Sequence, residues 1–255
     1  MHSTWARIIQ TILATLSFAA YPAAGGDEAP RELVRKVLDA LPKDPYVARL
    51  KVTVPNGPTR TLEVRQKILD GSRVTYLEVV APDELSGVRF LFRQPGDRPN
   101  EQFVKIPASR VLVQVSEDLR TQPFLGSTFY VTDLVEPPID RFDYAFVGEE
   151  ELLGRPCKLV EARPKEPKDQ VYGKTILALD PNDLLIVRRQ FFGPDGRLLK
   201  VWTVDRVEKV DGRWTMLEQK MENVQEKVAS ELDVESITYG AELDDQMFTP
   251  KYLLR

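Results

Sequence analysis

The chain has 255 residues, with 35 Lys and Arg against 39 Asp and Glu, and it contains one histidine and one cysteine. This mildly acidic balance argues against a nucleic-acid-binding protein, which needs a basic surface. One cysteine excludes an internal disulfide, and one histidine with one cysteine excludes the usual zinc sites.

The N-terminus has the pattern of a secretory signal peptide. Arg7 precedes an apolar run over residues 8–20, and small residues follow Pro22. The run is too short for a membrane span, which takes about 20 residues. We expect cleavage near Gly25 and release into the periplasm, because no cysteine stands nearby for lipid attachment. A cut after Ala19 and an uncleaved anchor are the alternatives.

Cleavage would also remove His2, the only histidine of the chain. The exported protein would then have no imidazole for nucleophilic catalysis. The acidic runs 149–151 and 244–245 are poor acid–base pairs, because adjacent strand residues point to opposite faces. Cys157, in a β-prone run, is interpreted as a buried inert thiol. We expect no enzyme, cofactor or metal, although a glycosidase with two distant carboxylates stays open.

After the signal peptide, the sequence predicts one helix followed almost entirely by strands. Residues 30–41 place apolar side chains on one helical face, and Pro42 ends the helix. Apolar and polar residues then alternate with period two, as in 62–68, 88–93 and 142–146. Turn signals rich in Gly, Pro, Asn and Asp separate about ten to twelve such runs.

This spacing predicts a mainly β fold, an antiparallel meander closed or half-closed as a barrel. We expect a single domain over residues 26–255, after the signal peptide of residues 1–25. Two segments interrupt the strands. Gln122–Ile139 contains a predicted short helix over Thr128–Leu134, and Glu161–Val171 is predicted to be a charged loop.

Aromatic residues at strand positions are candidates to line the inside of the barrel. For any one of them, a packed core is the simpler interpretation. A sheet of more than eight strands is, however, too wide for its own side chains to fill and leaves a cavity. Taken together, the aromatic candidates and the width of the sheet favour a carrier of an apolar ligand. The candidates are Phe90, Phe92, Phe103, Phe124, Phe129, Phe142, Phe146, Phe191, Phe192, Trp202 and Trp214.

Four short motifs stand out between residues 30 and 255. They are Phe103–Ala108 with Arg110, Pro123–Phe129 with Asp133 and Leu134, Gly154–Cys157, and Phe248–Thr249 with Leu253. Together they resemble the outer-membrane lipoprotein-sorting proteins, the LolA-like family. That family usually has Gly-Ser-Asp-Phe-Ser-Tyr-Glu-Asp-Leu at the second motif. This chain departs from it at Thr128, Tyr130, Val131 and Thr132.

The resemblance implies a half-barrel of about eleven antiparallel strands around an apolar groove, with helices as a lid. It also implies that the groove carries a lipid or lipidated protein across the periplasm, with transient contact to an inner-membrane exporter and an outer-membrane acceptor. We expect a monomer. The residues expected to bind lipid are Phe90, Phe92, Phe103, Phe124, Leu125, Phe129 and Phe142.

One alternative uses the same fold without carrying a lipid. An interaction module would dock on an envelope lipid exporter or sensor, and it could fill its barrel with its own side chains. An apolar cavity open to solvent would favour the carrier.

Overall fold

A computed structural model describes residues 28–96, 98–108, 111–116, 119–167 and 171–255. The predicted signal peptide and Arg110 lie outside these ranges. The strands are β1 (Tyr46–Thr53), β2 (Arg60–Leu69), β3 (Ser72–Ala81), β4 (Arg89–Gln94), β5 (Glu101–Lys105), β6 (Leu112–Gln114), β7 (Phe142–Leu152), β8 (Arg155–Pro164), β9 (Lys174–Asp180), β10 (Leu185–Phe192), β11 (Leu198–Val210), β12 (Arg213–Asn223) and β13 (Val228–Tyr239). The helices are α1 (Glu28–Ala40) and α2 (Pro250–Leu253), with the 3-10 turns η1 (Asp83–Leu85), η3 (Phe124–Gly126), η4 (Val131–Leu134), η5 (Ile139–Arg141) and η7 (Asp245–Phe248).

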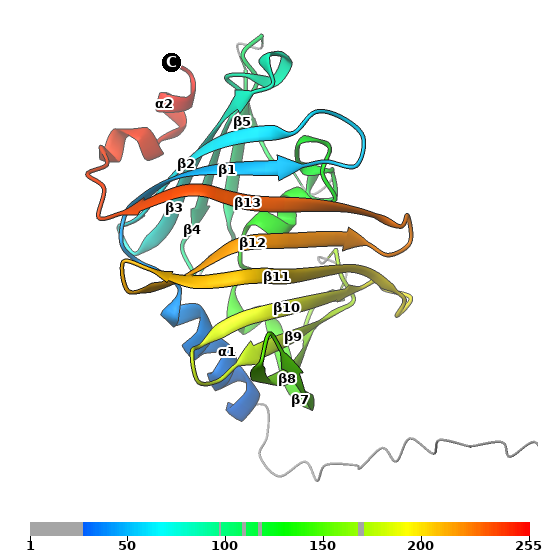
Figure 1. Cartoon of the computed structure of the whole chain (residues 1–255). Coiled ribbons are helices and arrows are strands. Elements are labelled where there is room, and N and C mark those ends of the chain that lie inside the picture. Colours follow the sequence, from blue (N-terminus) through cyan, green and yellow to red (C-terminus); the bar gives the residue numbers. More distant parts are fainter. Residues whose placement is uncertain (1–27, 97, 109–110, 117–118, 168–170) are drawn as a thin grey trace, which may run out of the picture.

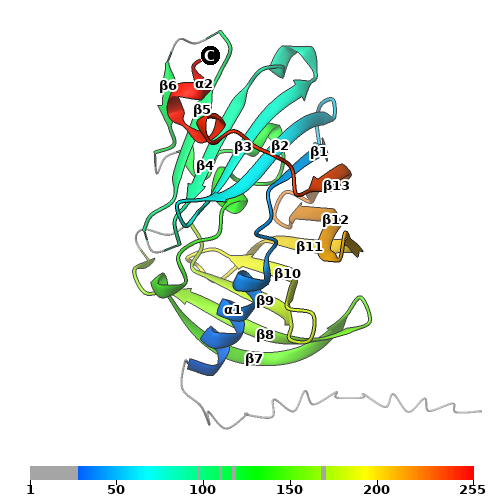
Figure 2. The same ribbon diagram turned by 90° about the vertical axis from the view of Figure 1, so that its left-hand side faces the viewer.

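All thirteen strands form one antiparallel sheet, bent into an open half-barrel (Figure 2). Strands that follow one another in the chain pair with one another, apart from β6 and β7, which are the two end strands of the sheet. The first and last strands of the chain lie side by side in the middle of the sheet, where β1 pairs with β13. The mainly β, half-open fold is therefore confirmed. The described residues contain thirteen strands rather than about eleven, because a strand as short as β6 leaves too few alternating positions to be recognised.

The predicted N-terminal helix is present as α1 and lies across the concave side of the sheet (Figures 1 and 2). It contacts β7, β10 and η5. Val34 and Val37 face the sheet and are buried, which is what the amphipathic pattern requires. In the described part of the chain, no helix is both long and apolar enough to cross a membrane.

Both faces of the sheet carry apolar clusters. The largest cluster lies on the concave side. On the convex side, the C-terminal segment packs Phe248 and Leu253 against Tyr76 and Leu91 of β3 and β4. A smaller convex cluster over β8–β10 contains Cys157, whose thiol is buried and free, as expected. Burial raises the pKa of this thiol.

Two local predictions were wrong. The helix expected over Thr128–Leu134 is reduced to η4, because Tyr130 forms a β-bridge with Pro123 and keeps the chain before η4 extended. The charged loop expected from Glu161 begins later, because β8 continues to Pro164. Near the end of a sheet, a strand that carries charged residues at alternating positions is hard to distinguish from a loop by its sequence.

Candidate functional site

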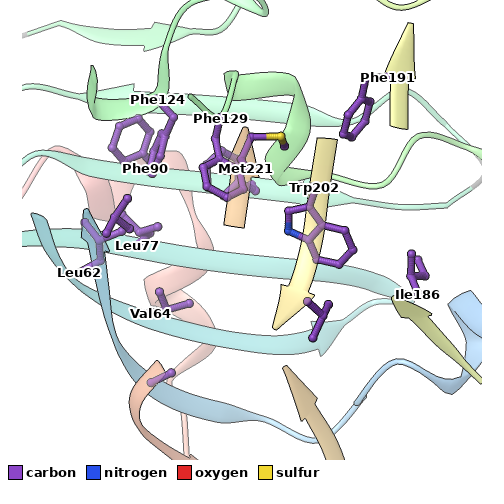
Figure 3. Close-up of a cluster of buried hydrophobic side chains, with 14 of the residues drawn as sticks. Leu62, Val64, Leu77, Phe90, Phe124, Phe129, Ile186, Phe191, Trp202 and Met221 are labelled. Atoms are coloured by element: carbon purple, nitrogen blue, oxygen red, sulfur yellow. The ribbon is translucent and has the colours of Figure 1, made fainter. Parts of the chain in front are cut away.

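The second motif folds into a tight loop that lies inside the half-barrel. We call residues 122–136 the motif loop. The N–H of Phe124 donates to the carbonyl of Phe129 over 2.8 Å, and the Ser127 hydroxyl donates to the carbonyl of Phe124 over 2.6 Å. Leu125 and Gly126 both have positive φ, 52° and 79°, so the chain reverses here. The reversal turns Phe124 and Phe129 into the apolar cluster, where they are 4% and 5% exposed (Figure 3).

Three hydrogen bonds tie the first half of the motif loop to the sheet. The hydroxyl of Thr128 donates to the carbonyl of Met221 on β12 over 2.6 Å. The N–H of Thr128 donates to the hydroxyl of Ser230 on β13 over 3.0 Å. Arg60 on β2 donates from Nε to the carbonyl of Leu125 over 3.2 Å. The loop is thereby fixed across both halves of the sheet.

A buried ion pair holds the second half of the motif loop. Lys200 Nζ on β11 lies 3.1 Å from Asp133 Oδ2, and both side chains are 1% exposed. The carboxylate also accepts from the Tyr130 N–H at 2.8 Å and from the Tyr172 hydroxyl at 2.7 Å. Desolvation lowers the pKa of Lys200 to about 8, although the Asp133 charge acts in the opposite direction. Such a pair needs its extra hydrogen bonds to offset the cost of removing two charges from water.

Under the motif loop, the concave face of the sheet encloses a cavity of about 780 Å³, which we call the main cavity. Strands β1–β4 and β10–β13 form its wall. A row of aligned residues across β13, β1, β2 and β3 forms its apolar floor. These residues are Ile237, Ala48, Val64 and Leu77. Volumes of about 300–1,000 Å³ are usual for small-molecule sites.

The main cavity opens at one end of the half-barrel. Its exposed lining residues lie at the end of α1, in the α1–β1 connection or in the β11–β12 turn, and they are Asp39, Ala40, Lys43 and Gly212. We call this end the mouth. At the other end of the cavity, Phe129 of the motif loop and Met221 contribute to the lining. The cavity is therefore an apolar groove with one polar opening.

A second, smaller cavity of about 180 Å³ lies between the motif loop, α1 and strands β9 and β10. It shares Asp133, Glu136 and Arg189 with the main cavity. Glu136 and Arg189 form an ion pair, and the Arg189 guanidinium also lies over the Trp202 ring, 5.4 Å from its centroid. The wall between the two cavities thus combines these charged side chains with the apolar side chains of Ile186 and Phe191.

The residues predicted to bind lipid fall into three groups. Phe92 and Phe129 line the main cavity, and Phe142 lines the smaller one. Phe90 and Phe124 pack against each other with ring centroids 5.1 Å apart, and half-buried Leu125 packs on the same cluster. The structure therefore brings these six residues to the concave side.

Phe103 does not join them. Its ring packs with Phe248 and Leu253 in the convex cluster, on the other face of the sheet. One of the broader aromatic candidates also lies elsewhere, since Phe146 is 48% exposed. Trp214 packs against the cluster around Cys157 and also borders the main cavity. Alternation alone does not tell which face of a strand is the inner one when both faces are covered.

Sequence reasoning missed the polar groups of the site. Gln66, Arg73 and Arg189 line the main cavity, and Lys200 anchors the motif loop. A signal was present for two of them. Gln66 follows Leu62 and Val64 at alternating positions, and Lys200 precedes Trp202 by two, so both polar residues share a strand face with apolar neighbours. Within the described ranges, no group of three or more His, Cys, Asp or Glu side chains is placed to hold a metal ion.

Comparison with known proteins shows which family and which solved structures this chain resembles. A family model described as "Uncharacterized protein" matches residues 71–255. The chain has no significant match among curated proteins.

Solved structures share the fold over nearly the full chain. One is described as an outer membrane lipoprotein-sorting protein domain, from Vibrio parahaemolyticus, with 21% identity, a TM-score of 0.83 and coverage of 90% of this chain and 100% of that one. A DUF1329 family protein from Desulfovibrio piger has 22% identity, a TM-score of 0.81 and coverage of 89% and 99%. A LolA superfamily protein from Nitrosomonas europaea has 16% identity, a TM-score of 0.66 and coverage of 88% and 98%. The chain belongs to the family of the model that matches residues 71–255, and it has the LolA-like fold.

Proposed function

We propose that the protein is a periplasmic carrier that binds the acyl chains of a lipid or lipoprotein in the main cavity. The observation that carries this proposal is the cavity itself, about 780 Å³ of space over an apolar floor with one open end. An interaction module without cargo has no use for such a space and would gain stability by filling it.

The physical task of a carrier fits this groove. Each acyl CH₂ kept from water is worth about 0.8 kcal/mol, so a lipid does not leave a membrane at a useful rate unaided. A groove that replaces the bilayer as an apolar solvent removes most of that cost. Transfer then needs an acceptor with higher affinity and no covalent step, so we propose a non-enzymatic role.

Six of the predicted residues remain candidates for contact with the cargo. Phe92 and Phe129 are the strongest, because their side chains line the main cavity. We exclude Phe103 from the proposed site, because it packs on the convex face. The similar fold of the domain described as an outer membrane lipoprotein-sorting protein domain supports a lipidated cargo and delivery toward the outer membrane.

The proposed location follows from the N-terminal sequence. We propose that residues 1–25 direct export and are removed, and that the remaining chain works as a monomer between an inner-membrane exporter and an outer-membrane acceptor. Osmotic shock should release a species shortened by about 25 residues. Recovery of the full-length chain in the inner membrane would contradict this part of the proposal.

Native mass spectrometry of protein purified from the periplasm tests the carrier function directly. We expect a population with an added mass that matches a lipid or lipidated peptide, and denaturation should release it. A protein that is free of lipid, and that also fails to bind added fatty acid, would favour the interaction module instead.

A further inference from the structure

The main cavity contains a buried hydrogen-bond donor for which the described part of the chain supplies no acceptor. Gln66 on β2 is 6% exposed, and its side chain lines the cavity. Its Oε1 accepts a hydrogen bond from the Tyr46 hydroxyl over 3.2 Å. Its Nε2 has no hydrogen-bond partner among the described residues. Buried polar groups of folded proteins are nearly always paired, so an orphan donor in a cavity wall points to a missing acceptor.

Beside it lies an arginine that has no ion pair among the described residues. Arg73 on β3 lines the same cavity and is half-buried. Its Nη1 donates to the carbonyl of Pro42 over 2.9 Å, and it forms no ion pair within the described part of the chain. Burial lowers the pKa of the guanidinium. The nearby carboxylate of Glu136 raises it, but that carboxylate is already paired with Arg189.

A third donor adds to this polar region. Nε of Arg189 is buried and unpartnered among the described residues, although the rest of the guanidinium pairs with Glu136. Arg189 also lines the main cavity. Two of the three unpartnered buried side-chain donors of the described residues, Gln66 Nε2 and Arg189 Nε, therefore lie in the wall of this cavity.

Strand register places Gln66 and Arg73 on the side of the apolar floor that faces the mouth. Gln66 is aligned with Tyr46 on β1 and with Thr75 on β3. Arg73 lies one row nearer the mouth, aligned with Gln94 on β4 and bonded to the α1–β1 connection. The next row inward is the apolar floor. A polar row over an apolar floor matches a molecule with a polar head and an apolar tail.

Resting on the proposed function, we propose that the mouth of the main cavity binds the acidic oxygen headgroup of a single-chain amphiphile, a carboxylate or a phosphate. The Arg73 guanidinium and the Gln66 amide donate to the headgroup oxygens, and the tail lies over the floor toward Phe129. Hydrogen bonds between charged partners are stronger than neutral ones, and exclusion of water strengthens them further. A neutral headgroup would leave the Arg73 charge without a partner.

Calorimetric titration with three ligands of equal tail length tests this inference. Laurate, dodecyl phosphate and dodecanol are titrated into delipidated protein purified from the periplasm. We expect one or both acidic ligands to bind at least about tenfold more tightly than dodecanol. The tighter of the two acids identifies the headgroup as a carboxylate or a phosphate.

Two variants and one control assign the effect to residues. Arg73→Met removes the charge at similar length, and Gln66→Leu removes the amide at similar volume. Each should weaken binding of the acidic ligand by about tenfold or more and change dodecanol binding less than about twofold. Arg206→Met removes the same charge from an exposed position on β11, and it should change neither affinity. Unchanged dodecanol binding shows in each case that the variant is folded.

The outcomes separate this inference from the proposed function. Equal affinity of the wild type for all three ligands, with no effect of Arg73→Met or Gln66→Leu, would overturn the headgroup site and leave the carrier intact. Failure of the wild type to bind any of the three would count against the carrier itself.

Discussion

Lys200 on β11 and Asp133 in the motif loop form an ion pair that is almost completely removed from water, with 3.1 Å between Nζ and Oδ2. The pair joins the loop that closes the inner end of the main cavity to the strand that carries Trp202. Asp133 matches the aspartate of the second motif, whereas its partner Lys200 is 67 residues away in the sequence. The position of the motif loop therefore depends on a contact that no local sequence pattern specifies.

A double-mutant cycle measures how far this pair anchors the loop. Lys200→Met and Asp133→Asn should each lower the free energy of unfolding by about 3–5 kcal/mol, because each leaves a buried polar partner uncompensated. The double variant should lose less than the sum by at least about 1 kcal/mol. Urea unfolding of the four proteins gives the coupling. Strict additivity would show that the two side chains do not depend on each other.

The same pair predicts a pH dependence of stability. The pKa of Lys200 is lowered to about 8 in the folded protein, whereas a free lysine has a pKa of about 10.4. Between these values the unfolded chain binds more protons, so the contribution of Lys200 to stability rises with pH from about 8 to about 10. Below pH 8 the contribution is constant at its lower level.

Comparison with a variant that lacks the pair isolates the pH-dependent contribution of Lys200 to the free energy of unfolding. The wild type should gain about 1–2 kcal/mol relative to Lys200→Met/Asp133→Asn between pH 7.5 and about pH 10. Titrating groups that do not interact with the pair, such as Tyr46 with its pKa raised to about 12, are common to both proteins and cancel. Parallel stability curves for the two proteins would contradict the assignment.

Thr128 accounts for one departure of this chain from the usual motif, which has Asp there. Its hydroxyl donates to the carbonyl of Met221 over 2.6 Å, a role that a carboxylate cannot fill. Thr128→Asp should therefore lower the free energy of unfolding by about 2 kcal/mol or more at neutral pH. Thr128→Ser keeps the donor and should cost less than about 1 kcal/mol. Equal stability of the two variants would show that this hydrogen bond does not anchor the loop.

The sequence was sufficient for the fold because its main signals are local. Period-two alternation marks each long strand, and the apolar stripe of residues 30–41 marks α1. The motif loop was also located, since Pro123, Gly126 and the flanking aromatics set its turn. These features depend on neighbours within a few residues and are visible without a structure.

The polar part of the site depends on distant neighbours and was not predicted. Arg73 is distinctive only because no carboxylate of the described residues pairs with it, which is a property of the folded surroundings. Phe103 was misassigned because the C-terminal segment, with Phe248, covers the convex face and makes both faces of β5 apolar. Sequence alternation gives the period of a strand but not the identity of its inner face.

Filling the main cavity should abolish binding while the fold is kept. Leu232 on β13 is half-buried and lines the cavity, so Leu232→Trp places a larger side chain in open space. We expect at least about tenfold weaker laurate binding and a change in the free energy of unfolding of less than about 1 kcal/mol. Glu231→Trp, exposed on the same strand, is the matched control and should bind as the wild type does. Wild-type affinity in Leu232→Trp would mean that lipid binds elsewhere.

Quenching of Trp202 fluorescence by a dibrominated fatty acid tests the central claim most directly. Trp202 is 8% exposed and lines the main cavity. Trp214 also borders this cavity, so Trp5→Phe and Trp214→Phe are introduced together to leave Trp202 as the single tryptophan. If acyl chains occupy the main cavity, dibromostearate will quench Trp202 saturably, and unlabelled stearate will reverse the effect. No quenching of Trp202 under conditions where the fatty acid binds would contradict a lipid carrier built around this cavity.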